Sequence, residues 1–202
     1  SKVKNQGSEG YCWAFASVAS MESSILSQND LKSKLGENPQ DTIDLSEAGQ
    51  TWYIHSGIVD KSSPFYGDYI DDSSKGSNGG TSDTLAISLN SGFGTYPQSL
   101  CPYNEVKKGF SETLRYYSDY RLKDYSEISN NKDTLKSKIV SNGAVTVYYP
   151  SITDCYSSDY ANYYSDNTCI GIGDAHLIVV VGWDDNYSKD NFTGKVKPSN
   201  DG

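Results

Sequence analysis

The sequence lacks the features that define several large classes of protein. It has no apolar run of about eighteen residues and no basic segment followed by an apolar one, so we expect neither a membrane span nor a signal peptide. Lys and Arg total 17 against 26 Asp and Glu, and the net charge of −9 argues against nucleic-acid partners, which need clustered basic residues. The 202 residues are enough for one domain, or two small lobes, with a hydrophobic core.

Metal-binding patterns are also missing. The four cysteines include no close Cys-x-x-Cys pair, and the Asp-rich segment 57–77 lacks the glycine and distal glutamate of an EF-hand. We therefore predict no metal site and no cofactor, and a solvated loop at 57–77. Cys155 and Cys169 flank a polar segment and could close a disulfide loop in an oxidising compartment. Two free thiols in a flexible loop are an equally supported alternative.

The stretch 6–25, QGSEGYCWAFASVASMESSI, places Cys12 at the start of a predicted amphipathic helix. Its expected buried face recurs at three- and four-residue steps: Phe15, Val18, Ala19, Glu22, Ile25 and Leu26. Gly7 and Gly10 allow a tight loop before the helix. The positive end of the helix dipole and its unpaired N–H groups favour a thiolate. Taken alone, this stretch favours a buried structural cysteine over a reactive one.

Gln6-Gly7-x-x-Gly10-x-Cys12-Trp13-Ala14-Phe15 resembles the active-site segment of papain-like cysteine peptidases. The resemblance implies that Cys12 is the nucleophile, that the Gln6 side chain donates to the oxyanion, and that Trp13 lies beside the substrate. It also implies an α+β fold of two lobes with the active-site cleft between them. We place a helical left lobe at 1–105 and a β-rich, barrel-like right lobe at 106–202.

A glycine pair at Gly79 and Gly80 precedes a predicted helix that runs from Ser82 to Leu89. Consecutive glycines expose backbone groups to which an extended peptide can bind as an added strand. The alternative is a glycine turn that caps the helix. The segment resembles the family's Asn-Gly-Gly motif, which implies that Gly80 pairs with the substrate backbone. Family members often join the two motifs by a disulfide; Glu9 and Ser77 occupy those positions here, which favours a bacterial member.

Several other elements are predicted from local patterns. Ser46 is placed to cap a helix that begins at Glu47. Residues 116–128 have strand-like composition, with alternation from 120 to 125. A short helix over 130–142, with Leu135, Ile139 and Val140 on one face, ends at Gly143, and a buried strand follows over 144–149.

His176 opens an apolar run, Leu177–Val181, that predicts a buried strand. A lone histidine at such a place is usually structural. Followed by Gly-Trp, however, the segment resembles that of the family's catalytic histidine. The resemblance implies that His176 pairs with Cys12 and that Ala175 lies at the substrate site. Such a pair converts a weakly ionised thiol into a thiolate, which attacks a peptide carbonyl.

The family's third residue, an Asn within Asn-Ser-Trp-Gly, has no counterpart in this sequence, and 183–202 resembles the hairpin that precedes it. We therefore expect a separate C-terminal segment of the same protein to complete the fold. The resemblance implies a cysteine endopeptidase, secreted or at the cell surface, similar to those of Gram-positive and clostridial bacteria. Its expected partners are a peptide or protein substrate and a propeptide. The alternatives are a non-catalytic binding module and a Cys–His acyl or amide transferase.

Overall fold

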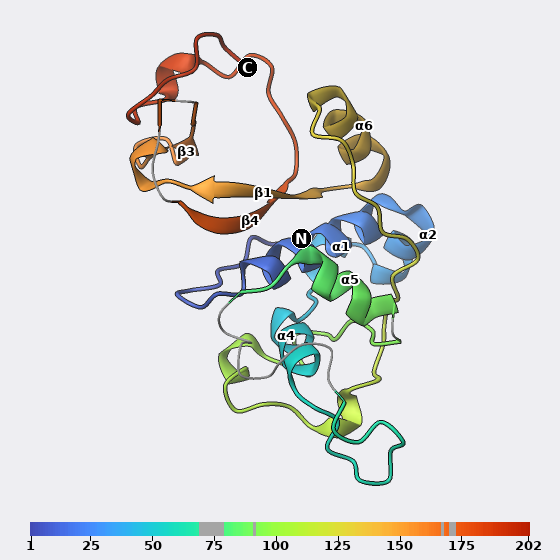
Figure 1. Ribbon diagram of the computed structural model, residues 1–202. Coiled ribbons are helices and arrows are strands. Elements are labelled where there is room, and N and C mark those ends of the chain that lie inside the picture. Colours follow the sequence, from blue (N-terminus) through green and yellow to red (C-terminus); the bar gives the residue numbers. More distant parts are fainter. Residues whose placement is uncertain (69–78, 91, 167, 170–172) are drawn as a thin grey trace.

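The computed structural model describes residues 1–68, 79–90, 92–166, 168–169 and 173–202 (Figure 1). The α-helices are α1 Cys12–Ser27, α2 Asn29–Lys32, α3 Pro39–Thr42, α4 Glu47–His55, α5 Ser82–Asn90 and α6 Lys132–Asn142. The strands are β1 Val145–Ser151, β2 Tyr156–Ser157, β3 Asn162–Tyr163 and β4 Asp174–Val180. Short 3-10 turns are η1 Ser33–Leu35, η3 Tyr103–Glu105, η4 Glu112–Leu114, η5 Thr153–Cys155 and η6 Lys189–Asn191. No described helix is long and apolar enough to cross a membrane.

Helix α1 occupies the middle of the molecule. It packs against α4 and α5 on one side and against β1 and β4 on the other (Figure 1). Cover from two sides buries Trp13, Ala14 and Ala16 as well as the predicted Val18, Glu22 and Ile25. Phe15, Ala19 and Leu26 of the predicted face are only partly buried, and Phe15 and Leu26 pack at the edges of buried clusters. The helix itself is confirmed, and it begins at Cys12.

Strands β1 and β4 form an antiparallel pair, in which Tyr149 lies opposite His176 and Val145 opposite Val180. Both strands were predicted to be buried, and that prediction was wrong, since no residue of either is fully buried. The physical reason is that α1 covers one face of a pair that has no second layer among the described elements. His176 is the third residue of β4 rather than its first.

Helix α6 is confirmed with the predicted end. The Asn131 side chain accepts hydrogen bonds from the N–H groups of Asp133 and Thr134, and Gly143 follows the helix at φ +95°. Its predicted apolar face is not buried, and Val140 is 74% exposed. Helix α6 therefore lies on the surface of the molecule and has no buried residue.

Two further strand predictions were wrong. Residues 116–128 form an extended segment that is not part of a sheet. The N–H of Thr95 donates to the Tyr120 carbonyl, and the N–H of Tyr120 donates to the Thr95 hydroxyl, but no regular strand ladder follows. The expected hairpin at 183–202 is a series of turns around η6, in which the N–H of Gly202 donates to the Tyr187 carbonyl. The part of loop 57–77 beyond residue 68, including Ser77, lies outside the described residues.

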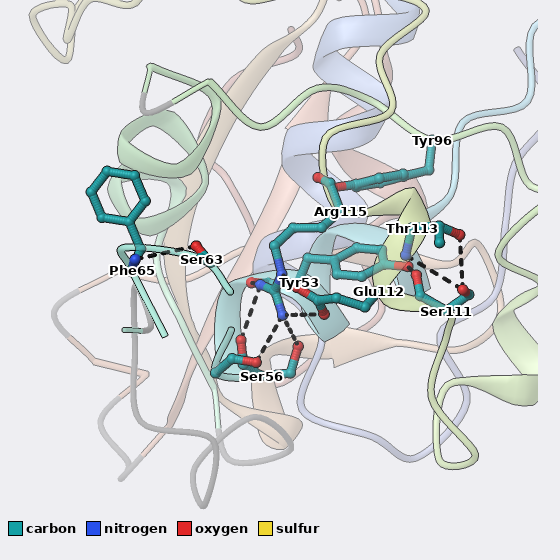
Figure 2. A network of polar contacts seen from close by, with 10 residues as sticks. Tyr53, Ser56, Ser63, Phe65, Tyr96, Ser111, Glu112, Thr113 and Arg115 are labelled. Atoms are coloured by element: carbon teal, nitrogen blue, oxygen red, sulfur yellow. Dashed lines mark hydrogen bonds and ion pairs between the residues drawn. The ribbon is translucent and has the colours of Figure 1, made fainter. Parts of the chain in front are cut away.

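Arg115, which directly precedes segment 116–128, is 1% exposed and bonds to the C-terminal end of α4 (Figure 2). Its guanidinium donates to the carbonyl oxygens of Tyr53 and Ser56 at 3.1 Å and pairs with Glu112. At the other end of α4, the Ser46 hydroxyl accepts from the N–H of Gly49 at 2.8 Å, which confirms the predicted cap. A buried cation with several acceptors thus holds the helix that carries His55.

Candidate active site

Cys12 is the first residue of α1, and its thiol is free and partly exposed. The preceding Tyr11 caps the helix without a side-chain bond, and its carbonyl accepts from the N–H groups of Ala14 and Phe15. Within the described part of the chain, no acceptor binds the N–H of Cys12. The thiol therefore lies at the positive end of a sixteen-residue helix, beside a donor that is free for a ligand.

The loop before α1 fixes the position of Gln6. The Gln6 side-chain Nε2 donates to the Glu9 carbonyl at 2.9 Å, and the Tyr103 hydroxyl donates to the Gln6 carbonyl at 2.6 Å. Gly7 turns the chain at φ +66°, a conformation that glycine adopts without strain. An amide NH₂ has two hydrogens, so one remains for an oxyanion after the bond to Glu9. Sequence reasoning missed Tyr103, whose partner is 97 residues away.

Trp13 connects helix α1 to the glycine pair. The indole is fully buried, and a Cβ added to Gly80 would lie 2.6 Å from it, so only glycine fits there. The His55 ring meets the indole edge to face, with centroids 5.7 Å apart. Gly79 has φ +115° and open space around it. The two glycines therefore lie next to the residue that follows Cys12, with Gly80 in contact with Trp13.

His176 is partly exposed on β4, and its ring meets that of Tyr149 on β1 at 5.7 Å between centroids. Tyr149 packs in turn against Tyr163, at 4.9 Å. Sequence reasoning missed both tyrosines. Alternation along 144–149 could have suggested a cross-strand partner, but not the register that selects Tyr149.

The structure places Cys12 and His176 on elements that pack together, α1 and β4, without a hydrogen bond between the two side chains. Leu177, next to His176, packs into the cluster that contains Trp13 and Ala14, next to Cys12. Among the described residues no hydrogen bond links the Cys12 thiol to the His176 imidazole or orients the imidazole. Ala175 is exposed opposite Pro150. Catalytic hydrogen bonds are often long in unliganded enzymes and tighten when the substrate binds.

A disulfide joins Cys155 and Cys169 just before β4. Lys195 donates its N–H to the Asp154 carbonyl, so the segment after β4 is attached beside this cross-link. The remaining free cysteine, Cys101, is buried, and burial raises the pKa of its thiol to about 11. Of the two free thiols, only Cys12 is placed to react.

An ionic cluster that sequence reasoning missed anchors the segment leading into the Gln6 loop. The Lys4 ammonium lies 3.0 Å from Glu22 and 2.9 Å from both Asp44 and Glu47. Burial lowers the pKa of Lys4, but the three carboxylates outweigh burial and the net shift is upward. Burial raises the pKa of Glu47 to about 7, although Lys4 opposes this. Burial is therefore the main reason why Glu47 holds its proton more tightly, and the charge of nearby Glu22 adds to it.

A cysteine at a helix N-terminus, a fixed glutamine before it and a histidine on the strand packed against that helix are typical of proteins that use a cysteine nucleophile. Residues 1–196 match the model of the papain family of cysteine proteases. The chain belongs to this family, and its fold is the papain-like α+β fold.

One solved structure with this fold contains the cysteine protease and lectin-like domains of Cwp84, a surface layer associated protein of Clostridium difficile. The two chains are 26% identical, with a TM-score of 0.73. The match covers 100% of the present chain and 40% of that chain. The comparison with curated proteins gave no match.

Proposed function

We propose that this chain is the catalytic part of a cysteine endopeptidase. The observation that carries the proposal is the position of Cys12: a partly exposed thiol at a helix start, beside a free N–H and the fixed Gln6 amide. Membership of the papain family supports it. The two-lobe division at 105/106 remains part of the proposal, with the cleft running past Cys12 and His176.

In the proposed reaction, the Cys12 thiolate attacks the substrate carbonyl while the N–H of Cys12 and the Gln6 amide stabilise the oxyanion. The His176 imidazolium gives its proton to the leaving amine, and a thioester to Cys12 remains. His176 then takes a proton from water, whose oxygen attacks the thioester and releases the carboxylic acid and the thiol. Gly79 and Gly80 would hold the extended substrate by backbone hydrogen bonds, bordered by Trp13 and Ala175.

The proposal extends to location and partners. The Clostridium difficile relative is a surface layer associated protein, which supports a secreted or cell-surface location here. Val140 and Val181 are 74% exposed and Trp183 is 48% exposed, so the molecule carries apolar side chains near its β1–β4 pair that could be covered. We infer that a further C-terminal segment of the same protein packs there and supplies the residue that orients His176. A propeptide is proposed to cover the cleft before activation.

The decisive test is covalent labelling. An epoxysuccinyl peptide without a basic group is incubated with reduced, folded protein, and the adduct is mapped by mass spectrometry. We expect one adduct, on Cys12, and none on the buried Cys101. The matched variants are Cys12→Ala, which should lose both labelling and peptide hydrolysis, and Cys101→Ala, which should keep both. A folded protein that gives no Cys12 adduct would contradict the peptidase proposal.

The role of Gln6 is tested separately. Gln6→Ala should lower kcat by about 10²–10³-fold, the loss typical of one oxyanion donor, with KM nearly unchanged. Labelling of Cys12 should persist, since the nucleophile is intact. An unchanged kcat would remove Gln6 from the mechanism.

A second function is favoured by one observation, the lack of a hydrogen bond between Cys12 and His176 in the described residues. A papain-like module that binds peptides without cleaving them would show this feature. In that case, extended peptides bind to the wild type and to Cys12→Ala alike, and neither hydrolyses them. Transfer of the acyl group to an added amine, without hydrolysis, would instead indicate an acyl or amide transferase.

A further inference from the structure

The loop 6–11 carries Gln6, the proposed oxyanion donor, into helix α1. It contains neither helix nor strand. Its internal hydrogen bonds are short-range: the Glu9 carbonyl accepts from the Gln6 side chain and from the N–H of Tyr11, both at 2.9 Å. Such bonds shape the loop, but they do not fix it against the rest of the molecule.

A long-range hydrogen bond ties this loop to the other end of the packed half. The Tyr103 hydroxyl donates to the backbone carbonyl of Gln6 at 2.6 Å, across 97 residues of sequence. No other group in the described part of the chain donates to that carbonyl. Burial raises the pKa of Tyr103 to about 12, so the hydroxyl keeps its proton and remains a donor near neutral pH.

Tyr103 is itself held in place by its neighbours. Its ring meets those of Tyr11 and Phe15 edge to face, with centroids 6.2 and 5.0 Å apart. It also packs against a buried cluster that includes Ala48 and Val106. Aromatic pairs of this geometry are favourable beyond the area that they bury. The hydroxyl therefore extends from a fixed ring, whose position does not depend on the hydrogen bond to the loop.

A second link between the same two segments is weaker. The Lys107 ammonium lies 2.5 Å from the Glu9 carboxylate, but the Lys107 side chain is 73% exposed. Exposed ion pairs contribute little, because water and salt screen them. The Tyr103 hydroxyl is therefore the link on which the position of Gln6 depends.

We propose that Tyr103 is a positioning residue, whose hydroxyl holds the loop so that the Gln6 amide meets the oxyanion. This role rests on the proposed peptidase function. When the Cys12 thiolate adds to the substrate carbonyl, the electron pair of the C=O π bond moves onto oxygen, and the remaining N–H of Gln6 Nε2 must point at that oxygen. A misplacement of about 1 Å can cost about 10²-fold in rate. Tyr103 thus acts on the reaction through Gln6.

The first test needs no activity. Tyr103→Phe removes the hydroxyl and keeps the ring. Tyr53→Phe is the matched control, because the Tyr53 hydroxyl also donates to a backbone carbonyl at 2.6 Å, that of Ser111, in a different buried cluster. Hydrogen–deuterium exchange of peptides that cover 6–11 should be about fivefold faster in Tyr103→Phe, the effect of one lost hydrogen bond on local opening, and unchanged in Tyr53→Phe. Wild-type exchange in Tyr103→Phe, or equal acceleration in both variants, would overturn the proposal.

The second test is steady-state kinetics with a peptide substrate. Tyr103→Phe should lower kcat about tenfold and change KM less than about twofold, since the oxyanion forms only after binding. Tyr53→Phe should keep the wild-type kcat. Alkylation of Cys12 by iodoacetamide, which displaces iodide and forms no oxyanion, should proceed at the wild-type rate in both variants. A wild-type kcat in Tyr103→Phe, or a parallel loss of alkylation rate, would contradict the positioning role.

A double-mutant cycle assigns the effect to Gln6. In a Gln6→Ala background, Tyr103→Phe should lower kcat by less than about twofold, because the donor that it positions is already gone. A further tenfold loss would mean that Tyr103 acts through another group, and the proposal would be wrong. If the wild type neither hydrolyses peptides nor gives a Cys12 adduct, the peptidase proposal fails instead, and the exchange experiment shows separately whether Tyr103 holds the loop.

Discussion

The half of the molecule around α1, α4 and α5 differs sharply from the half formed by α6, β1 and β4. In the first, Trp13, Ala14 and Ile54 are fully buried in one cluster, and further clusters surround it. Beyond Val106, the buried hydrophobic side chains among the described residues are Ala144, Cys155 and Cys169. The proposed nucleophile, Cys12, thus lies on a packed core, while His176 lies on a two-stranded sheet.

This difference shows two ways of positioning a reactive side chain. Cys12 is held by its own helix, whose two sides are packed. His176 is held through neighbours: Leu177 against the α1 cluster, Tyr149 across the strand pair and the disulfide before β4. We therefore expect substitutions to act on stability mainly in the first half, and a covalent cross-link to matter mainly in the second.

The largest expected contrast is between two tryptophans. Trp13→Ala removes a buried indole and should lower the free energy of unfolding by about 3–5 kcal/mol. Trp183→Ala removes a half-exposed indole, which has the Lys136 ammonium 5.2 Å from its ring centroid and a hydrogen bond with Asp185, and should cost less than about 1 kcal/mol. Chemical denaturation of both variants measures the contrast. Similar losses would erase the distinction between the two halves.

The next effect concerns the cross-link. The double variant Cys155→Ser with Cys169→Ser opens a loop with a sequence separation of 14 and should cost about 3 kcal/mol, because the unfolded chain regains freedom. Cys101→Ala in the packed half is the control that leaves the disulfide in place. Denaturation curves under non-reducing conditions give the comparison. A stable double variant would mean that the β1–β4 half holds itself together without the cross-link.

The ionic cluster should make the packed half sensitive to pH. Burial raises the pKa of Glu47 from 4.5 to about 7, so the folded state binds this proton more tightly than the unfolded state. The contribution of Glu47 to stability is therefore present below about pH 4.5 and is lost as the pH rises toward about 7, by roughly 2–3 kcal/mol. Glu47→Gln should flatten the stability curve over this interval. A variant whose curve has the wild-type slope would contradict the assignment.

The smallest expected effect is at the glycine pair. Gly80→Ala places a Cβ 2.6 Å from the Trp13 indole, and the forced shift should cost about 1–2 kcal/mol and raise KM. Gly182→Ala, with no atom within 4 Å of the added Cβ, should leave both unchanged. Thermal melts and steady-state kinetics of the two variants measure these effects. An unaltered KM for Gly80→Ala would separate this glycine from substrate binding.

Local signals in the sequence predicted α1, α4, α5 and α6, because capping and hydrophobic periodicity act within a few residues, but not the short helices α2 and α3. The start of α4 follows from the Ser46 cap, and the end of α6 follows from the positive φ of Gly143. Strand predictions failed at 116–128 because composition permits a strand but cannot supply a partner for it. Burial of β1 and β4 was overestimated because a local sequence pattern does not show whether one face of a sheet or both faces are covered by other elements.

The sequence by itself determined where the Cys12 thiol lies: first in a helix, after a glycine-containing loop, with a glutamine six residues before it. Only the tertiary structure decided which residues surround that thiol. The contact of Gly80 with Trp13, the pairing of Tyr149 with His176 and the sharing of Lys4 by three carboxylates each join residues that are distant in sequence. Such contacts depend on register and on helix packing, which no short-range pattern encodes.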